Sequence, residues 1–184
     1  MNPFSSLWHS LLRRRHSRGF GIHSPYAYRF VTDVVRPRIY GYYAYDDIDA
    51  DDTIPARSIR TAKWYVRLLI FLKPARILFF RVVDAPAKTA SDCLGIQSEI
   101  LRNPAAVDFA ASDFLIITNG NESPPNIVLE AINSGAKVLI FNPDKNLVAS
   151  IISTGLQGLL LEDKRKMLFI PRDEMAFTHY HISF

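Results

Sequence analysis

The chain has 184 residues, of which 48% are hydrophobic and 22% are charged, a composition that suits one compact domain and excludes global disorder. Its uninterrupted apolar runs are too short for a helix that spans a bilayer, and its start lacks the charged and apolar regions of a secretory signal. A single cysteine, Cys93, cannot form an internal disulfide or a thiolate zinc site. We therefore expect a cytoplasmic protein without a membrane span.

Charge is distributed unevenly along the chain. The net charge is +4, yet residues 1–43 contain seven arginines and one acidic residue, Asp33, and five aspartates follow within residues 46–52. A basic segment of this kind is typical of proteins that bind nucleic acid or an anionic membrane surface, and it can also pair with the acidic cluster behind it.

Residues 1–56 are predicted to form a basic, tyrosine-rich and helical extension. Serine caps predict a first helix that ends near Arg18 and a second that begins at Ser24-Pro25 and stops at Pro37. We expect the aspartate-rich segment to be a loop. The first helix carries an apolar stripe that must be buried against the domain or another chain, formed by Leu7, Trp8, Leu11 and Leu12.

Residues 57–184 alternate between helices and apolar strands, which predicts an α/β domain with a mostly parallel sheet. Consecutive strands at the end of the chain predict an antiparallel C-terminal edge. The predicted helices are 58–72, 87–101, 125–134 and 145–153. The predicted strands are 76–83, 113–118, 137–141, 158–161, 167–170 and 177–183.

The loops after the first three strands form the candidate ligand site, because open α/β sheets bind ligands beyond the carboxyl ends of their strands. The first loop, Asp84-Ala85-Pro86-Ala87, has no glycine, and its proline has no N–H to offer a phosphate. The other two loops offer amide side chains, which also serve as turn and cap residues. The candidate crevice residues are Asp84, Ala85, Asn119, Gly120 and Asn142.

Other patterns that carry chemistry are sparse. His179 and His181 lie two apart in a predicted strand and project from one face, but the sequence shows no third ligand, so we predict a surface or interface strand and no metal site. No serine-triad, phosphate-loop or zinc pattern is present, and we predict no catalytic residue. The arginines and tyrosines of the extension could bind nucleic acid through phosphate pairing and base stacking, or pack the extension onto the sheet.

One block of the sequence resembles a known family. Arg18-Gly19-Phe20-Gly21-Ile22-His23-Ser24-Pro25-Tyr26, followed by Tyr42-Tyr43-Ala44-Tyr45, is similar to the N-terminal segment of bacterial class I S-adenosylmethionine-dependent methyltransferase-like proteins. In that family a helix leads from this segment into the first strand, and the closing run from Phe177 to Phe184 resembles its last strand. The resemblance implies a Rossmann-like sheet that is mostly parallel.

The chain also departs from that family. Members usually carry an acidic, glycine-rich cofactor loop where this chain has Asp84-Ala85-Pro86-Ala87, and aspartates where it has Asn119 and Asn142. An amide supplies no charge for a hard cation. The 29 residues between Val83 and Asp113 accommodate one crossover helix and a stub strand at 106–109, so the resemblance implies that part of the sheet is missing. Asp108 is then the only candidate for the acidic contact to the cofactor ribose.

We therefore predict a truncated methyltransferase-like domain that has lost S-adenosylmethionine binding and catalysis and needs no cofactor. It would act as an interaction protein, with a protein partner or a second copy docking on the N-terminal helix or the C-terminal strand. Two alternatives stay open: an active S-adenosylmethionine-dependent methyltransferase with a rebuilt pocket, and nucleic-acid binding through the Arg/Tyr-rich N-terminal segment.

Overall fold

The computed structural model describes residues 15–184, apart from 17, 20, 38–40, 103–106 and 121–123. The predicted apolar stripe of Leu7, Trp8, Leu11 and Leu12 lies outside the described residues. None of the helices that the structure describes combines the length and the apolar character needed to cross a bilayer.

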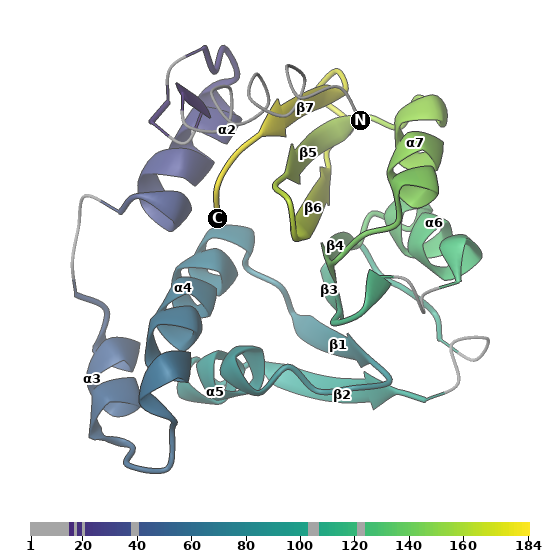
Figure 1. Cartoon of the computed structure of the whole chain (residues 1–184). Coiled ribbons are helices and arrows are strands. Elements are labelled where there is room, and N and C mark those ends of the chain that lie inside the picture. The colour runs from purple at the N-terminus through teal and green to yellow at the C-terminus, as the bar shows by residue number, and fades with distance from the viewer. Residues whose placement is uncertain (1–14, 17, 20, 38–40, 103–106, 121–123) are drawn as a thin grey trace.

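The described strands form one seven-stranded sheet in the order β2-β1-β3-β4-β6-β5-β7 (Figure 1). The three central strands β1, β3 and β4 are adjacent and parallel, as predicted. Only β6 runs against its neighbours β4 and β5, so the predicted mostly parallel α/β sheet is confirmed. The strands are β1 Arg76–Phe80, β2 Gln97–Leu101, β3 Asp113–Ile117, β4 Lys137–Phe141, β5 Gly158–Glu162, β6 Lys166–Pro171 and β7 Thr178–His181.

Helices cover both faces of the sheet, because alternate strand residues point to opposite sides and both sides are apolar. On one face, α2, η1, α3, α4 and α5 pack against residues such as Phe79 and Phe114, and on the other α6 and α7 pack against residues such as Leu78 and Leu115. The helices are α2 Pro25–Phe30, the π-helix η1 Val31–Val35, α3 Tyr43–Ala50, α4 Ala56–Leu72, α5 Ala85–Cys93, α6 Pro125–Asn133 and α7 Lys145–Ser153.

The N-terminal elements are built into the same core as the sheet. Ser24 caps α2 by accepting a hydrogen bond from the Ala27 N–H, and Pro25 occupies the first turn, as predicted. Phe30 is fully buried and meets Phe184, near the C-terminus, edge to face at 6.3 Å between ring centroids. The beginning and the end of the described chain therefore pack together over α4.

The aspartate-rich segment is a helix, which corrects the predicted loop. Three of its aspartates lie within α3, and the other two follow it in a turn. Ala44 and Ile48 are one helical turn apart and buried, so they give α3 an apolar side despite its acidic composition. Asp49 also accepts a hydrogen bond from the Lys63 ammonium of α4 at 2.5 Å.

The predicted helix 87–101 is wrong in its second half. The helix α5 ends at Cys93, and Gly95 follows in the left-handed region with φ +66°, where glycine carries no steric penalty. The remaining residues form β2, an edge strand parallel to β1. The chain therefore has a second strand that the sequence analysis missed, whereas residues 107–109 of the predicted stub strand are not in a strand.

The C-terminal edge also differs from the predicted antiparallel one. The edge strand β7 is parallel to β5, and the reversed strand β6 lies inside the sheet between β4 and β5. A short loop joins β5 to β6, so these two strands form a hairpin. After β6 the chain passes β5 and adds β7 at the edge of the sheet.

Candidate functional site

The predicted crevice residues lie where the sequence places them, after the carboxyl ends of β1, β3 and β4. Asp84 precedes α5 and Ala85 begins it, Asn119 and Gly120 follow β3, and Asn142 follows β4. The structure brings Gly120 and Asn142 into contact.

The loops after β3 and β4 are packed together. A Cβ placed on the buried Gly120 would lie 2.7 Å from the Asn142 carbonyl oxygen and 2.8 Å from the Pro143 Cα atom. Asn142 adopts a left-handed conformation with φ 49°, and its N–H donates a hydrogen bond to the Arg165 carbonyl at 2.6 Å. The backbone itself therefore fills the space between these two loops.

The Asp84 side chain stabilises the start of α5. Its carboxylate accepts a hydrogen bond from the Ala87 N–H at 3.0 Å and caps α5. Burial raises the pKa of Asp84, and this outweighs the opposing effects of the Ala87 N–H and of the positive charge of Lys166. The loop uses its acidic residue to begin a helix.

An aromatic cage closes the neighbouring part of the same edge. The Lys166 ammonium lies 4.6, 5.4 and 5.8 Å from the ring centroids of Trp64, Phe141 and Phe184. Lys166 pairs with Phe141 at the carboxyl end of β4, so the cage lies on the same edge as the candidate crevice residues. Burial lowers the pKa of Lys166, against the charges of Asp163 and Asp84. We call these four residues the Lys166 cage.

Two polar atoms beside the cage lack a hydrogen-bond partner among the described residues, the Trp64 indole Nε1 and the Tyr65 hydroxyl. Tyr65 is fully buried and Trp64 is 7% exposed, so neither donor faces an open crevice. Burial raises the pKa of Tyr65 well above its usual range, and the nearby Asp84 charge adds to the rise. At this edge, therefore, the two donors are enclosed, and the loops after β3 and β4 touch.

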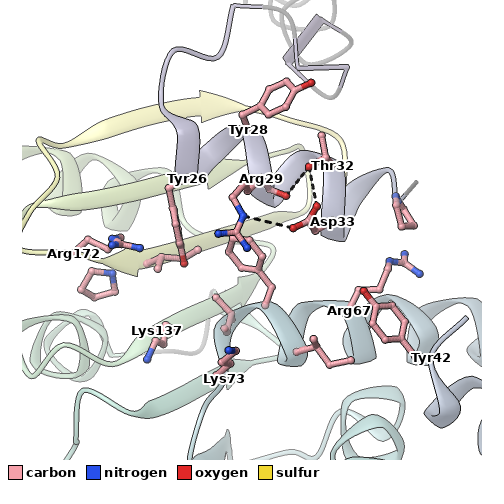
Figure 2. A pocket seen from close by; sticks show the side chains of 16 residues that line it. Tyr26, Tyr28, Arg29, Thr32, Asp33, Tyr42, Arg67, Lys73, Lys137 and Arg172 are labelled. Carbon is pink, nitrogen blue, oxygen red and sulfur yellow. Dashed lines mark hydrogen bonds and ion pairs between the residues drawn. The ribbon is translucent and has the colours of Figure 1, made fainter. Parts of the chain in front are cut away.

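A pocket of about 950 Å³ opens at the opposite ends of the strands, where β1, β3 and β4 begin (Figure 2). We call this side the amino edge of the sheet. Lys137 is the first residue of β4, and Arg172 directly follows the last residue of the reversed strand β6. The helices α2 and η1 and the C-terminal end of α4 supply the remaining wall. Lys73 closes α4 in a left-handed conformation with φ 48° and so lies at this edge.

The pocket is strongly cationic. Among the residues that the structure describes, its lining contains five basic side chains and one acidic side chain, Asp33. Asp33 lies 3.9 Å from the Arg29 guanidinium at an exposed position, which leaves an excess of positive charge. Burial lowers the pKa of Lys137, whose ammonium donates a hydrogen bond to the Ala111 carbonyl at 2.7 Å. The basic residues are Arg29, Arg67, Lys73, Lys137 and Arg172.

Tyrosine side chains help to position two of these cations, Arg172 and Arg67. The Arg172 guanidinium stacks 4.3 Å from the Tyr26 ring centroid, and Tyr26 packs against Phe71 at 5.1 Å. Arg67 is fixed by donating hydrogen bonds to the Val34 carbonyl and the Tyr45 hydroxyl, each at 2.9 Å. Positive charge and planar rings therefore share one wall of the pocket, which is the arrangement that binds phosphate groups and flat ligands.

Sequence reasoning missed this pocket, because its residues come from positions as far apart as Tyr26 and Arg172. The mixture of arginines and tyrosines in residues 1–56 was the available signal, and it supplies Tyr26, Arg29 and Tyr42. Searches with family models, among curated proteins and among solved structures give no match to this chain.

Proposed function

We propose that this chain is a methyltransferase-like protein that has lost S-adenosylmethionine binding and catalysis and acts by binding an anionic ligand in the pocket at the amino edge of the sheet. The observation that carries the proposal is the contrast between the two edges. The carboxyl edge is packed with the chain's own loops and with the Lys166 cage, whereas the amino edge is open and cationic.

The methyltransferase-like part of the proposal has two supports. The resemblance implied a mostly parallel sheet and a helix that leads into the first strand, and α4, β1 and the mostly parallel sheet fit that order. Loss of the cofactor is supported by the loop after β1, which lacks glycine and uses Asp84 as a helix cap.

The ligand class follows from the chemistry of the pocket. Guanidinium groups pair with phosphate oxygens through two parallel hydrogen bonds, and tyrosine rings stack on planar groups. A volume of about 950 Å³ holds a ligand of nucleotide size. We infer a small molecule that carries both a phosphate group and an aromatic ring.

Calorimetry with adenosine 5′-monophosphate, adenosine and inorganic phosphate tests this inference. We expect the monophosphate to bind more tightly than either part alone, and Lys73→Ala and Arg172→Ala to weaken binding about tenfold each, since each removes one charged contact of about 1.4 kcal/mol. Lys145→Ala is the matched control, because Lys145 is exposed on α7 away from the pocket. Equal binding of adenosine and its monophosphate would overturn the inference.

Nucleic-acid binding is the second candidate, and the observation that favours it is the origin of the pocket wall. Tyr26, Tyr28 and Arg29 come from the Arg/Tyr-rich N-terminal segment, and Tyr28 is 40% exposed. Fluorescence anisotropy with a labelled single-stranded oligonucleotide distinguishes the candidates. Strong binding that falls steeply with salt favours nucleic acid, because each neutralised phosphate releases counterions. If the protein binds the monophosphate but not the oligonucleotide, the result favours the small ligand.

A further inference from the structure

We propose that Glu162, His179 and His181 bind a divalent transition-metal ion of the zinc class, at the end of the sheet formed by β5 and β7. The three side chains come together only through strand pairing, and each offers one ligand atom within 4.8 Å of the others. The site is separate from the amino-edge pocket and does not depend on the proposed function.

The strand register fixes the three side chains on one face. In the parallel pair of β5 and β7, Glu162 lies opposite His181, and His179 lies opposite Leu160, two residues before Glu162. Side chains two residues apart on a strand share a face, so both histidines point to the side of Glu162. Tyr180, between them, points to the other face, where it is buried in the core.

One Glu162 carboxylate oxygen lies near both histidines, so the three side chains can converge on one ion. His179 Nε2 lies 3.0 Å from a Glu162 carboxylate oxygen, and His181 Nδ1 lies 3.8 Å from the same oxygen. The second distance is too long for a hydrogen bond. Zinc binds nitrogen and oxygen at about 2.0–2.2 Å, which places tetrahedral ligands about 3.3 Å apart. The ligand atoms lie within 4.8 Å of one another, so their separations have to shorten by up to about 1.5 Å to close the site.

The ligand types determine which ion fits. Two imidazoles and one carboxylate suit zinc and its neighbours among the transition metals, whereas magnesium and calcium prefer oxygen ligands alone. The side chains are 24–25% exposed, so an ion can reach them from solvent. Three protein ligands leave a fourth position for water, which is the arrangement of an open zinc site.

The end of β7 is also anchored, which holds the ligands in place. His16 Nδ1 and the His181 carbonyl oxygen are 3.1 Å apart, and the His16 ring meets Tyr180 edge to face at 5.3 Å between centroids. The Ile182 N–H donates a hydrogen bond to the Glu162 carbonyl at 2.8 Å. These contacts fix the backbone on both sides of His181, so the site is largely organised before an ion binds.

Metal titration of the full-length, tag-free chain tests the proposal, after removal of bound ions with a chelator. We expect calorimetry with zinc chloride to give one ion per chain with a Kd of about 10 µM or below, and cobalt to give the visible absorption of a low-symmetry site. His181→Ala and Glu162→Gln should each weaken binding at least about tenfold. Circular dichroism should show that both variants are folded.

The control is His23→Ala. His23 is exposed, and only its backbone N–H contacts Tyr180, so its side chain is no part of the cluster. We expect this variant to bind zinc as the wild type does. His179→Gln gives a third ligand variant that keeps a polar side chain of similar size. The proposal is overturned if the wild type shows no saturable binding below about 100 µM, or if the folded ligand variants bind zinc as tightly as the wild type.

Discussion

Adding a methyl group at Gly120 should destabilise the protein, because the loops after β3 and β4 are in contact there. The new Cβ would lie 2.7 Å from the Asn142 carbonyl oxygen and 2.8 Å from the Pro143 Cα atom, so backbone has to move. Overpacking of this kind costs about 1–3 kcal/mol. Gly120 is not in the left-handed region, so alanine also reduces the entropy of the unfolded chain and returns about 0.5–1 kcal/mol. We expect Gly120→Ala to lower the free energy of unfolding by about 0.5–2 kcal/mol.

Urea unfolding of a graded pair of variants measures this effect. Gly120→Val adds two more methyl groups at the same contact and should cost clearly more than Gly120→Ala, about 3 kcal/mol or above. Ala85→Val is the control, since Ala85 is exposed at the start of α5, and it should stay within about 0.7 kcal/mol of the wild type. If both Gly120 variants unfold as the wild type does, the two loops are apart and the carboxyl edge has room for a ligand.

Three further predictions concern the buried polar groups. Tyr65→Phe removes a hydroxyl that lacks a hydrogen-bond partner, so the free energy of unfolding measured in urea should stay equal or rise by up to about 1 kcal/mol. A loss above about 1.5 kcal/mol would mean that the hydroxyl is hydrogen-bonded. Asp113→Asn should cost about 1–3 kcal/mol at neutral pH, because the Asp113 side chain is 3% exposed and accepts hydrogen bonds from Arg76 at 2.7 and 3.1 Å; an unchanged midpoint would refute this. Burial opposes ionisation of Asp113, but the hydrogen bonds and charge of Arg76 and the Ala110 N–H outweigh it and lower its pKa. This stabilisation is therefore present above about pH 4 and is lost as the pH falls through the lowered pKa of Asp113. The difference in free energy of unfolding between Asp113→Asn and the wild type should therefore become smaller in acid. A difference that does not change with pH would contradict this prediction.

Local features of the fold could be predicted from the sequence because they depend on neighbouring residues. Ser24 and Pro25 begin α2, and the apolar run Lys137–Phe141 forms β4 with the predicted bounds. Caps, prolines and apolar periodicity act within a few residues, so their signals are readable in order along the chain.

The sequence-based predictions fail where tertiary contacts determine the local structure. Gln97–Leu101 has a pattern that fits a helix as well as a strand, and the free edge of β1 selects the strand. The acidic α3 forms because Ala44 and Ile48 are buried against its neighbours. The sequence could not show that Glu162 joins His179 and His181, because Glu162 is brought beside His181 only by the register of β5 and β7.

The two edges of the sheet illustrate the same limit for the candidate site. The topology rule correctly placed Asp84, Asn119 and Asn142 at the carboxyl ends of the strands, but it does not tell whether that edge is open. The Lys166 cage at that edge forms between Lys166, Trp64 and Phe184, which are remote from one another in sequence. The cationic pocket on the other edge depends on how the N-terminal helices pack, which residue patterns alone do not specify.

Titration calorimetry of the full-length chain with S-adenosylmethionine and S-adenosylhomocysteine tests the central proposal most directly. We predict no saturable heat up to about 1 mM of either ligand, the affinity range that remains when several polar contacts of about 1–3 kcal/mol are unmade. A dissociation constant at or below about 10 µM, near −7 kcal/mol, would show that the carboxyl edge opens to hold the cofactor and would contradict the account.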